Sequence, residues 1–259
     1  MTKLSKLSRS VEGKVVLITG AASGMGRATA HLFSDEGSVV VVTDVNEDGV
    51  KEVVSEINNA GNTAYGIQLD VSDKKSIQNC IKTIKTKYNA LDILINNAGI
   101  SSRIEIDNQD YEEYWDKTFD VLLKGQVILI REALPFLLKS ESGRIVNISS
   151  TEGLGATPRI SPYTTAKHGV IGLTRSLAVE LGSKGITVNC ICPGPINTSM
   201  TKNIPQNDKE IYARRRVPLK RYGDPEEVAH ATLSLCLPAS SFINGVVLPV
   251  DGGLTIKRA

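Results

Sequence analysis

The stretch TGAASGMG, residues 19–26, decides the fold. It follows the apolar run KVVLIT, which begins at Lys14, and leads directly into a segment with helical spacing of apolar residues. Glycines let the backbone turn tightly and approach a pyrophosphate, to which the N-terminus of the next helix presents unpaired N–H groups. A glycine-rich turn alone is a weak signal, but between a buried strand and an amphipathic helix it predicts a dinucleotide-binding loop.

The residue that ends the second apolar run indicates which dinucleotide binds. Asp44 lies 20 residues beyond Gly24. An acidic side chain at that distance can accept hydrogen bonds from an adenosine ribose. A carboxylate also repels a 2′-phosphate, and neither residues 21–23 nor Val45 supplies a Lys or Arg to neutralise one. The sequence therefore predicts NAD rather than NADP.

Strand-like and helix-like segments alternate along the chain. Apolar, β-branched runs are separated by segments with helical spacing, such as 72–88 and 162–181. Near-continuous apolar strands joined by helical crossovers indicate a parallel sheet covered on both faces. We therefore expect an α/β fold, a doubly wound (Rossmann-type) sheet of about seven strands. The runs are KVVLIT from Lys14, SVVVVT from Ser38, TAYGIQL from Thr63, LDILIN from Leu91, RIVNIS from Arg144, ITVNCI from Ile186 and VVLPV from Val246.

The chain shows no internal repeat, low-complexity tract or long linker. A single dinucleotide-binding and catalytic domain over residues 1–259 is therefore expected, with 1–12 as an N-terminal extension. Residues 193–222 are rich in Pro, Asn and basic side chains and are predicted to form a long excursion over the sheet edge. Long loops of compact domains often act as lids, so this segment is the predicted substrate lid.

Local signals mark the starts of two helices. Ser161 before Pro162 predicts an N-cap followed by a proline in the first turn. Asp224, Pro225 and Glu227 predict the same arrangement with a capping box. Helix initiation therefore explains Glu227 better than acid/base chemistry does.

The charge balance excludes several classes of partner. The chain has 30 Lys plus Arg and 28 Asp plus Glu, a formal net charge of +2. This composition lacks the concentrated basic face that broad binding to nucleic acid or to a membrane surface needs. No run approaches the roughly 20 apolar residues of a membrane span, and residues 1–10 lack the apolar core of a secretory signal. We expect a soluble, cytoplasmic protein.

The side chains that commonly bind metals are scattered. None of the 4 cysteines has zinc-site or redox spacing. Cys190 and Cys192 alternate within an apolar run and are predicted to be small buried side chains. The three histidines lack partners at ligand spacing, so no metal site is expected; they are His31, His168 and His230.

Tyr163 and Lys167 lie four residues apart in YTTAK, so on a helix they share one face. An unperturbed tyrosine, with a pKa of about 10, is a poor base near neutral pH. A nearby ammonium favours the phenolate and lowers that pKa, which makes the phenol a usable proton donor and acceptor. Such pairs are common on surfaces, and the chemical interpretation depends on a third polar group, Ser150, at the end of RIVNIS.

Together, these motifs resemble those of the short-chain dehydrogenase/reductase family in its common single-domain form. The resemblance extends from Lys14 to about Gly253. The ordered motifs are TGAASGMG at 19–26, Asp70 after the third apolar run, NNAG at 96–99, NISS at 147–150, YTTAK at 163–167, PGPINTSM at 193–200 and VDGG at 250–253.

The resemblance implies three catalytic residues. Tyr163 would be the general acid/base for the substrate hydroxyl or carbonyl, and Ser150 would hold that oxygen by a hydrogen bond. Lys167 would bind the nicotinamide ribose and tune Tyr163. The family's serine precedes its tyrosine by 13 residues, which selects Ser150 over Ser149.

The resemblance also implies a set of residues that bind the cofactor. Asp70 would contact the adenine, Asn97 would line the cofactor groove, and the Ile196 backbone and Thr198 hydroxyl would meet the nicotinamide carboxamide. The full set is Gly20, Ser23, Gly24, Met25, Gly26, Asp44, Asp70, Val71, Asn97, Ala98, Gly99, Tyr163, Lys167, Pro193, Gly194, Ile196 and Thr198.

One position departs from the family's pattern. Where the family reads VNLKG, this chain reads VLLKG, and Leu122 replaces the Asn of the catalytic tetrad. In the family that Asn helps to hold a relay water, largely through its main-chain carbonyl. Leu122 would retain this function if the local helix distortion is preserved.

The sequence therefore predicts an oxidoreductase that transfers a hydride between NAD(H) and a small secondary alcohol or ketone. Two alternatives stay open: a nucleotide-binding regulator or scaffold, supported by Leu122, and an acyl-carrier thioester ketoreductase, which would predict NADP. A homotetramer is expected from the family and from the long predicted helices 111–138 and 162–181. Arg214, Arg215 and Arg216 are expected on a solvated basic face or in ion pairs between subunits, and contact with an acidic substrate stays open.

Overall fold

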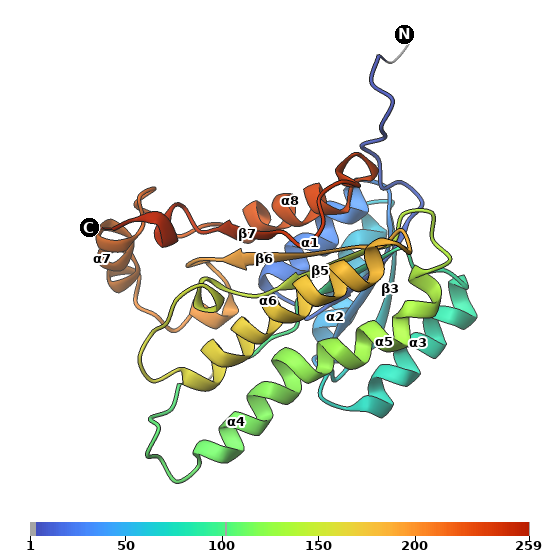
Figure 1. The fold of residues 1–259 in the computed structure, drawn as a ribbon. Helices are drawn as coiled ribbons and strands as arrows, with labels where there is room; N and C mark the ends of the chain where they lie inside the picture. The colour runs from blue at the N-terminus through green and yellow to red at the C-terminus, as the bar shows by residue number, and fades with distance from the viewer. Residues whose placement is uncertain (1–3, 102, 259) are drawn as a thin grey trace.

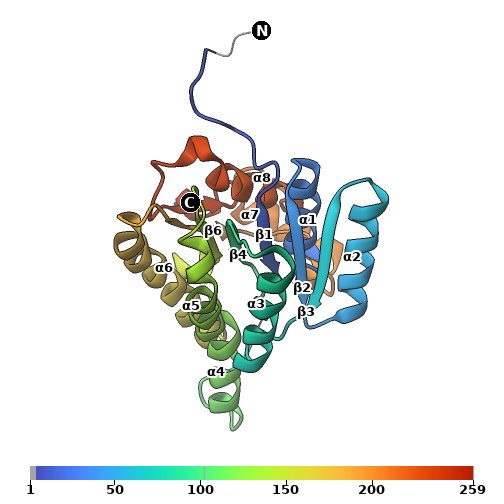
Figure 2. The ribbon, with the colours of Figure 1, turned by 90° about the vertical axis from the view of Figure 1, so that its right-hand side faces the viewer.

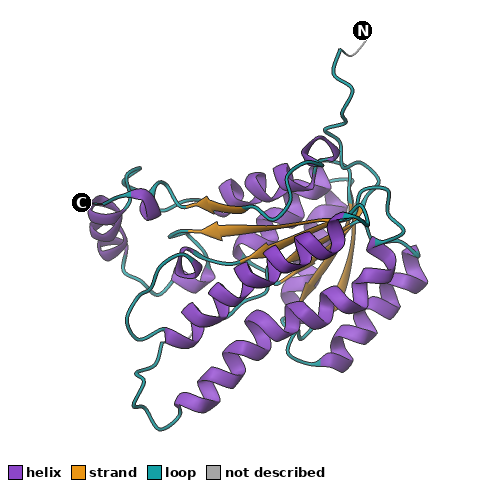
Figure 3. Cartoon of the chain, viewed as in Figure 1, coloured by secondary structure: helices purple, strands orange, loops and turns teal. Residues whose placement is uncertain are grey.

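The computed structural model describes residues 4–101 and 103–258, and within them seven strands form one parallel sheet (Figure 1, Figure 3). The strand order is β3-β2-β1-β4-β5-β6-β7. Because β1 lies between β2 and β4, successive crossovers lead outward in both directions, which confirms the predicted doubly wound fold. The strands are β1 (Val15–Thr19), β2 (Val39–Asp44), β3 (Thr63–Gln68), β4 (Ile93–Asn96), β5 (Arg144–Ile148), β6 (Thr187–Pro193) and β7 (Val247–Val250).

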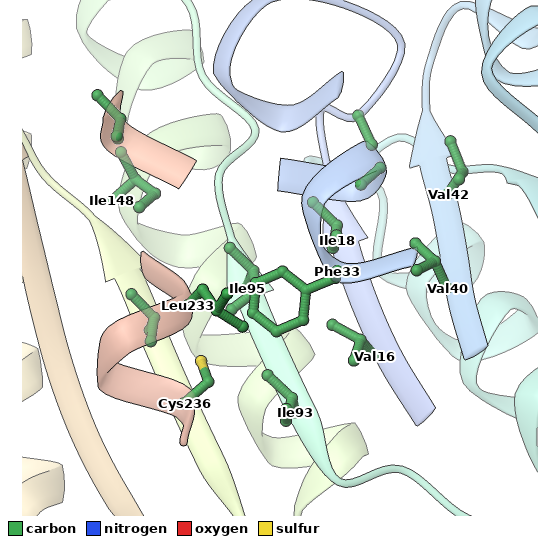
Figure 4. Close-up of a cluster of buried hydrophobic side chains, with 14 of the residues drawn as sticks. Val16, Ile18, Phe33, Val40, Val42, Ile93, Ile95, Ile148, Leu233 and Cys236 are labelled. Carbon is green, nitrogen blue, oxygen red and sulfur yellow. The ribbon is translucent and has the colours of Figure 1, made fainter. Parts of the chain in front are cut away.

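Helices cover both faces of the sheet (Figure 2). They are α1 (Gly24–Asp35), α2 (Glu47–Asn59), α3 (Lys74–Tyr88), α4 (Tyr111–Phe119), α5 (Gly125–Leu137), α6 (Ser161–Gly182), α7 (Gln206–Arg216) and α8 (Pro225–Cys236). One apolar cluster joins the sheet to α1, α2 and α8, with Phe33 and Leu233 packed over Ile18 and Ile95 (Figure 4). A second cluster, which includes Ile77, joins the opposite face to α3, α5 and α6.

The carboxyl ends of β1 and β4 are tied together at the centre of the sheet. The hydroxyl of Thr19, at the end of β1, accepts hydrogen bonds from the N–H groups of Asn97 at 3.0 Å and Ala98 at 2.9 Å, just after β4. In open α/β sheets a ligand binds in the crevice where crossovers diverge, beyond the carboxyl ends of the strands. The glycine loop after β1 lies at this point.

The helix predicted over residues 111–138 is interrupted by a π turn. α4 passes into π-helical residues Asp120–Lys124, and α5 begins at Gly125, whose N–H donates to the carbonyl of Asp120. Gly125 also lies against the loop after β3, because a Cβ there would be 2.4 Å from the carbonyl oxygen of Val71. π turns are rare and often occur at functional sites.

The two predicted helix starts have different outcomes. The capping box of α8 is confirmed, and the N–H of Asp224 donates to Oε2 of Glu227 at 2.8 Å. The prediction that Ser161 caps α6 is wrong, because Ser161 is the first helical residue and follows Ile160, whose side chain makes no capping bond. The Ser161 hydroxyl instead lies 2.8 Å from the hydroxyl of Tyr111 on α4. This tertiary contact replaces the local cap.

Residues 193–222 contain more regular structure than the predicted loop. The segment holds the last residue of β6, a 3₁₀ turn over Ser199–Thr201 and the helix α7. Only Ala213 is buried on α7. The helix therefore lacks the apolar periodicity by which a sequence reveals helices.

The cysteines and other potential metal ligands are dispersed in the structure. All four cysteines are free and buried, which confirms the prediction for Cys190 and Cys192. Residues 4–101 and 103–258 contain no cluster of three or more His, Cys, Asp and Glu side chains that could hold a metal ion. Among the helices of these residues, none is both long enough and apolar enough to cross a membrane.

Gly125→Ala is expected to lower the free energy of unfolding by about 1–3 kcal/mol, as overpacking does. The ideal Cβ would lie 2.4 Å from the carbonyl oxygen of Val71 and 3.0 Å from that of Asp120, and both are backbone atoms. Gly172→Ala is the matched control, because nothing lies within 4 Å of its Cβ position on α6. Alanine should stabilise that helix by roughly 0.5–1 kcal/mol. Urea unfolding measures both variants, and equal changes would contradict the close approach at Gly125.

Candidate active site

A cavity of about 260 Å³ lies at the diverging ends of β1 and β4. It is lined by the glycine loop, the end of β2, residues after β4, the start of α6 and residues after β6. The structure thus brings ten predicted site residues to one cavity. They are Gly20, Ser23, Gly24, Met25, Asp44, Asn97, Gly99, Tyr163, Lys167 and Thr198.

The other predicted site residues do not line this cavity. Gly26 lies beneath the loop, and the carboxylate of Asp70 accepts hydrogen bonds from the N–H and hydroxyl of Ser72 at 2.8 and 2.6 Å. Ile196 is buried and lines a neighbouring cavity. The remaining residues outside the cavity wall are Val71, Ala98, Ser150, Pro193 and Gly194.

The glycine loop can accept a pyrophosphate. Gly20 and Gly24 have positive φ angles of 64° and 54°, and a Cβ at Gly26 would lie 2.1 Å from the carbonyl oxygen of Gly20. The side-chain amide of Asn97 braces the turn by donating to that same carbonyl at 3.1 Å. Ser23, the N-cap of α1, makes no capping hydrogen bond with its side chain. Within the part of the chain that the structure describes, no side chain caps the first N–H groups of α1, an arrangement that suits a bound phosphate.

The carboxylate of Asp44 is held at the cavity wall. Its Oδ2 accepts from the N–H of Ala22 at 3.2 Å and its Oδ1 from the N–H of Asn46 at 2.9 Å. Each carboxylate oxygen has a further lone pair for a ligand hydroxyl. Arg27, the cation on α1, is already paired with Glu52 at 3.2 Å. The Asp44 carboxylate therefore has accepting capacity for a ligand hydroxyl at the cavity wall.

Lys167 is buried beside Tyr163. Its ammonium donates to the carbonyl of Ile148, at the end of β5, at 2.8 Å and lies 5.5 Å from the centre of the Tyr163 ring. Burial lowers the pKa of Lys167 to about 8. The i,i+4 spacing therefore does place the two side chains together, as predicted.

The pKa of Tyr163 shifts in the direction opposite to the sequence prediction. We expected the lysine ammonium to lower it, but burial raises the pKa of the phenol. A hydrogen bond with Ser150 lowers the pKa and offsets part of this rise, while the negative charge of Glu152 raises it further. Burial dominates because the charged phenolate loses more hydration than these neighbours replace.

Several residues of the cavity wall were not predicted. Ser149 donates its hydroxyl to the carbonyl of Lys167 at 2.8 Å, and Ser199 lies 3.2 Å from Ser23 across the glycine loop, measured between the hydroxyl oxygens. The Ser199 contact joins segments 176 residues apart, so no local pattern could reveal it. Ser149 was discarded in favour of its neighbour on spacing alone. The full set is Ile100, Ile148, Ser149, Ser199 and Met200.

Leu122 lies inside the π turn and is fully buried, with an exposure of 0%. Its Cδ2 atom lies 3.3 Å from the position that a Cβ on Gly99 would occupy. The leucine therefore packs under the NNAG segment while the helix distortion remains in place. The helix distortion that the sequence-based expectation requires at this position is therefore present with leucine.

The three arginines of α7 are exposed. They occupy the last turn of the helix, where a positive charge is favourable at the negative end of the helix dipole. Arg214 lies 3.9 Å from Glu210 on the same helix. This placement agrees with a solvated basic face. The three residues are Arg214, Arg215 and Arg216.

The chain has close relatives over nearly its whole length. Residues 20–255 match the model of the family described as enoyl-(acyl carrier protein) reductase. The 3-oxoacyl-(acyl-carrier-protein) reductase FabG of Thermotoga maritima is 40% identical over 246 residues, which cover 95% of this chain and 99% of the relative.

Solved structures show the same fold. The NADH complex of 3-ketoacyl-(acyl-carrier-protein) reductase from Brucella melitensis superposes with a TM-score of 0.88 at 31% identity, over 95% of this chain and 100% of the other. A putative NAD(P)-dependent gluconate 5-dehydrogenase from Beutenbergia cavernae, with bound NADP, gives a TM-score of 0.90 at 33% identity, over 96% and 100% of the two chains. The matches and the fold together show that the chain belongs to the short-chain dehydrogenase/reductase family of oxidoreductases.

Proposed function

We propose that the protein is an NAD(H)-dependent oxidoreductase that interconverts a small secondary alcohol and a ketone. The observation that supports this most directly is a single cavity lined by the glycine loop, Asp44, Tyr163 and Lys167. The NADH bound to the Brucella relative and the NADP bound to the Beutenbergia structure support a nicotinamide dinucleotide. The hydrogen-bonded carboxylate of Asp44 favours NAD.

Tyr163 is the proposed general acid/base, with Ser150 and Lys167 as its partners. When bound, the nicotinamide dinucleotide accepts or donates the hydride at the alcohol carbon. In oxidation, Tyr163 takes the hydroxyl proton, and in reduction it returns a proton to the carbonyl oxygen, which Ser150 holds by a hydrogen bond. Burial raises the pKa of Tyr163, which favours the protonated phenol that ketone reduction needs. The nearby Lys167 ammonium stabilises the phenolate when it forms.

The remaining site and assembly assignments are also proposals. Asp70 and Val71 are assigned to the adenine end of the cofactor, and Ile196 with Thr198 to the nicotinamide carboxamide. Residues 193–222, including α7, would cover the substrate. A cytoplasmic homotetramer completes the proposal.

Reduction of an acyl-carrier thioester is a second candidate activity. It is favoured by the 40% identity to the Thermotoga reductase. Because the Brucella reductase carries NADH, a preference for NAD does not by itself oppose this activity. A 3-oxoacyl thioester therefore belongs in any substrate panel beside simple secondary alcohols and ketones.

The unmodified protein is expected to bind NADH more tightly than NADPH. Asp44→Asn should weaken NADH binding about tenfold to a hundredfold, because a charge-assisted hydrogen bond to the ribose is lost. Asp48→Asn is the control, since that carboxylate is 96% exposed on α2. Fluorescence titration measures both cofactors. Equal or tighter NADPH binding by the unmodified protein would show that the assignment of Asp44 is wrong.

Tyr163→Phe is expected to lower kcat by about 10² to 10⁴, the usual contribution of a general acid/base. Cofactor affinity should remain, because the aromatic ring is kept. Absorbance of reduced nicotinamide follows turnover across the panel of alcohols, ketones and a thioester. Tyr65→Phe, on the edge strand β3, is the control. Near-normal turnover by Tyr163→Phe would refute the mechanism.

Leu122→Asn should change kcat by less than about tenfold, below the range for loss of an acid/base group. The π turn is already present with leucine, so the backbone does not require the amide. Leu122→Ala measures the loss of packing against Gly99 without a new polar group. An inert wild type that Leu122→Asn alone rescues would instead support the nucleotide-binding regulator.

A further inference from the structure

Glu152 lies on a short 3₁₀ turn, Thr151–Gly153, between β5 and α6. The Ser150 hydroxyl accepts a hydrogen bond from the N–H of Glu152 at 3.1 Å. A Cβ on Gly153 would lie 2.9 Å from the carbonyl oxygen of Lys167 and 2.5 Å from Oγ of Ser149. The turn is therefore packed tightly against α6, and the backbone of Glu152 is fixed next to the proposed catalytic residues.

The carboxylate of Glu152 is held by two threonine hydroxyls. Thr157 donates to Oε1 at 2.7 Å, and Thr164, the residue after Tyr163, donates to Oε2 at 3.2 Å. These bonds orient the carboxylate and leave each oxygen a further lone pair. None of the ion pairs formed by residues 4–101 and 103–258 includes Glu152. A half-buried, oriented carboxylate without a cation has accepting capacity for a ligand.

The charge of Glu152 acts on two phenols that come from different elements. Burial is the largest cause that raises the pKa of Tyr163 on α6 and of Tyr212 on α7, and the charge of Glu152 raises both further. Ser150 and Glu152 both lie outside the wall of the dinucleotide cavity, whereas Tyr163 belongs to it. The backbone of Glu152 bonds the Ser150 hydroxyl, and its carboxylate bonds Thr164, the residue after Tyr163, so an acidic acceptor lies beside the two residues proposed to hold the substrate oxygen.

We propose that Glu152 determines substrate specificity by accepting a hydrogen bond from a second hydroxyl group on the carbon next to the reacting carbon. This inference rests on the proposed function and narrows the substrate class to vicinal diols and α-hydroxyketones. A cationic amine, which the carboxylate also attracts, is the competing ligand class that the test distinguishes. An adjacent carboxylate would be repelled by Glu152.

The test compares kcat/KM for butane-2,3-diol, butan-2-ol and 3-aminobutan-2-ol. The wild type should prefer the diol over butan-2-ol, and Glu152→Gln should reduce that ratio about tenfold, because a neutral amide oxygen accepts a weaker hydrogen bond. Turnover of butan-2-ol is the reference, because any effect of the lost charge on the pKa of Tyr163 acts on both alcohols and cancels in the ratio; circular dichroism shows that the variant is folded. Glu180→Gln, an exposed position at the far end of α6, should leave the ratio unchanged.

Thr157→Val removes one of the two hydroxyls that orient the carboxylate while keeping its charge, and it should reduce the ratio less than Glu152→Gln does. An unchanged ratio in Glu152→Gln overturns the proposal. A larger loss with the amino alcohol than with the diol also overturns it, in favour of a cationic substrate.

The experiments distinguish failure of the proposed oxidoreductase function from failure of the proposal for Glu152. If the wild type oxidises no secondary alcohol with either cofactor, that function is wrong, and calorimetric titration of the two alcohols into wild type and Glu152→Gln decides the role of Glu152. Tighter diol binding that the variant loses supports the proposal, whereas equal binding of diol and butan-2-ol by the wild type overturns it.

Discussion

The close approach of the glycine loop to the end of β4 is the constraint on which the site depends. A Cβ on Gly20 would lie 2.7 Å from the Cα of Ala98, and Asn97 donates its amide to the carbonyls of Thr19 and Gly20. Any side chain at Gly20 would separate two central strands that the core clusters hold together. With the loop pinned in this way, α1 starts at the diverging strand ends, and its first N–H groups face the same cavity as Tyr163 and Lys167.

Most of the fold could be predicted because its signals are local. The central strand runs are apolar on both faces, as a covered parallel sheet requires, and the predicted bounds agree with the seven strands to within about two residues. Helix α7 escaped prediction because only Ala213 is buried, so no apolar stripe marks it. The role of Ser161 was predicted wrongly because its hydrogen-bond partner, Tyr111, lies on another helix. Local propensity cannot anticipate a contact of that kind.

The residues of the candidate site also fall into two groups: those that local sequence patterns indicate and those that only the folded chain brings to the cavity. The glycine loop, Asp44 and the Tyr163–Lys167 pair were visible as spacings, and the structure brings them together. Ser199 and Met200 fall within the PGPINTSM motif and the predicted lid but were not assigned to the site, because their place on the cavity wall depends on the path of the chain after β6. The pKa of Tyr163 was predicted in the wrong direction because burial, a property of the folded state, outweighs a charge that the sequence does show.

The sparse anchoring of α7 has an evolutionary consequence. With Ala213 as its only buried residue, the helix contributes little to the apolar core, and its charged surface can mutate at small cost in folding stability. Tyr212, whose pKa the Glu152 charge raises in addition to burial, is carried on this helix. Selection can therefore diversify the side of the molecule that carries α7 while the sheet and glycine loop stay intact, so that changes there need not wait for compensating core mutations.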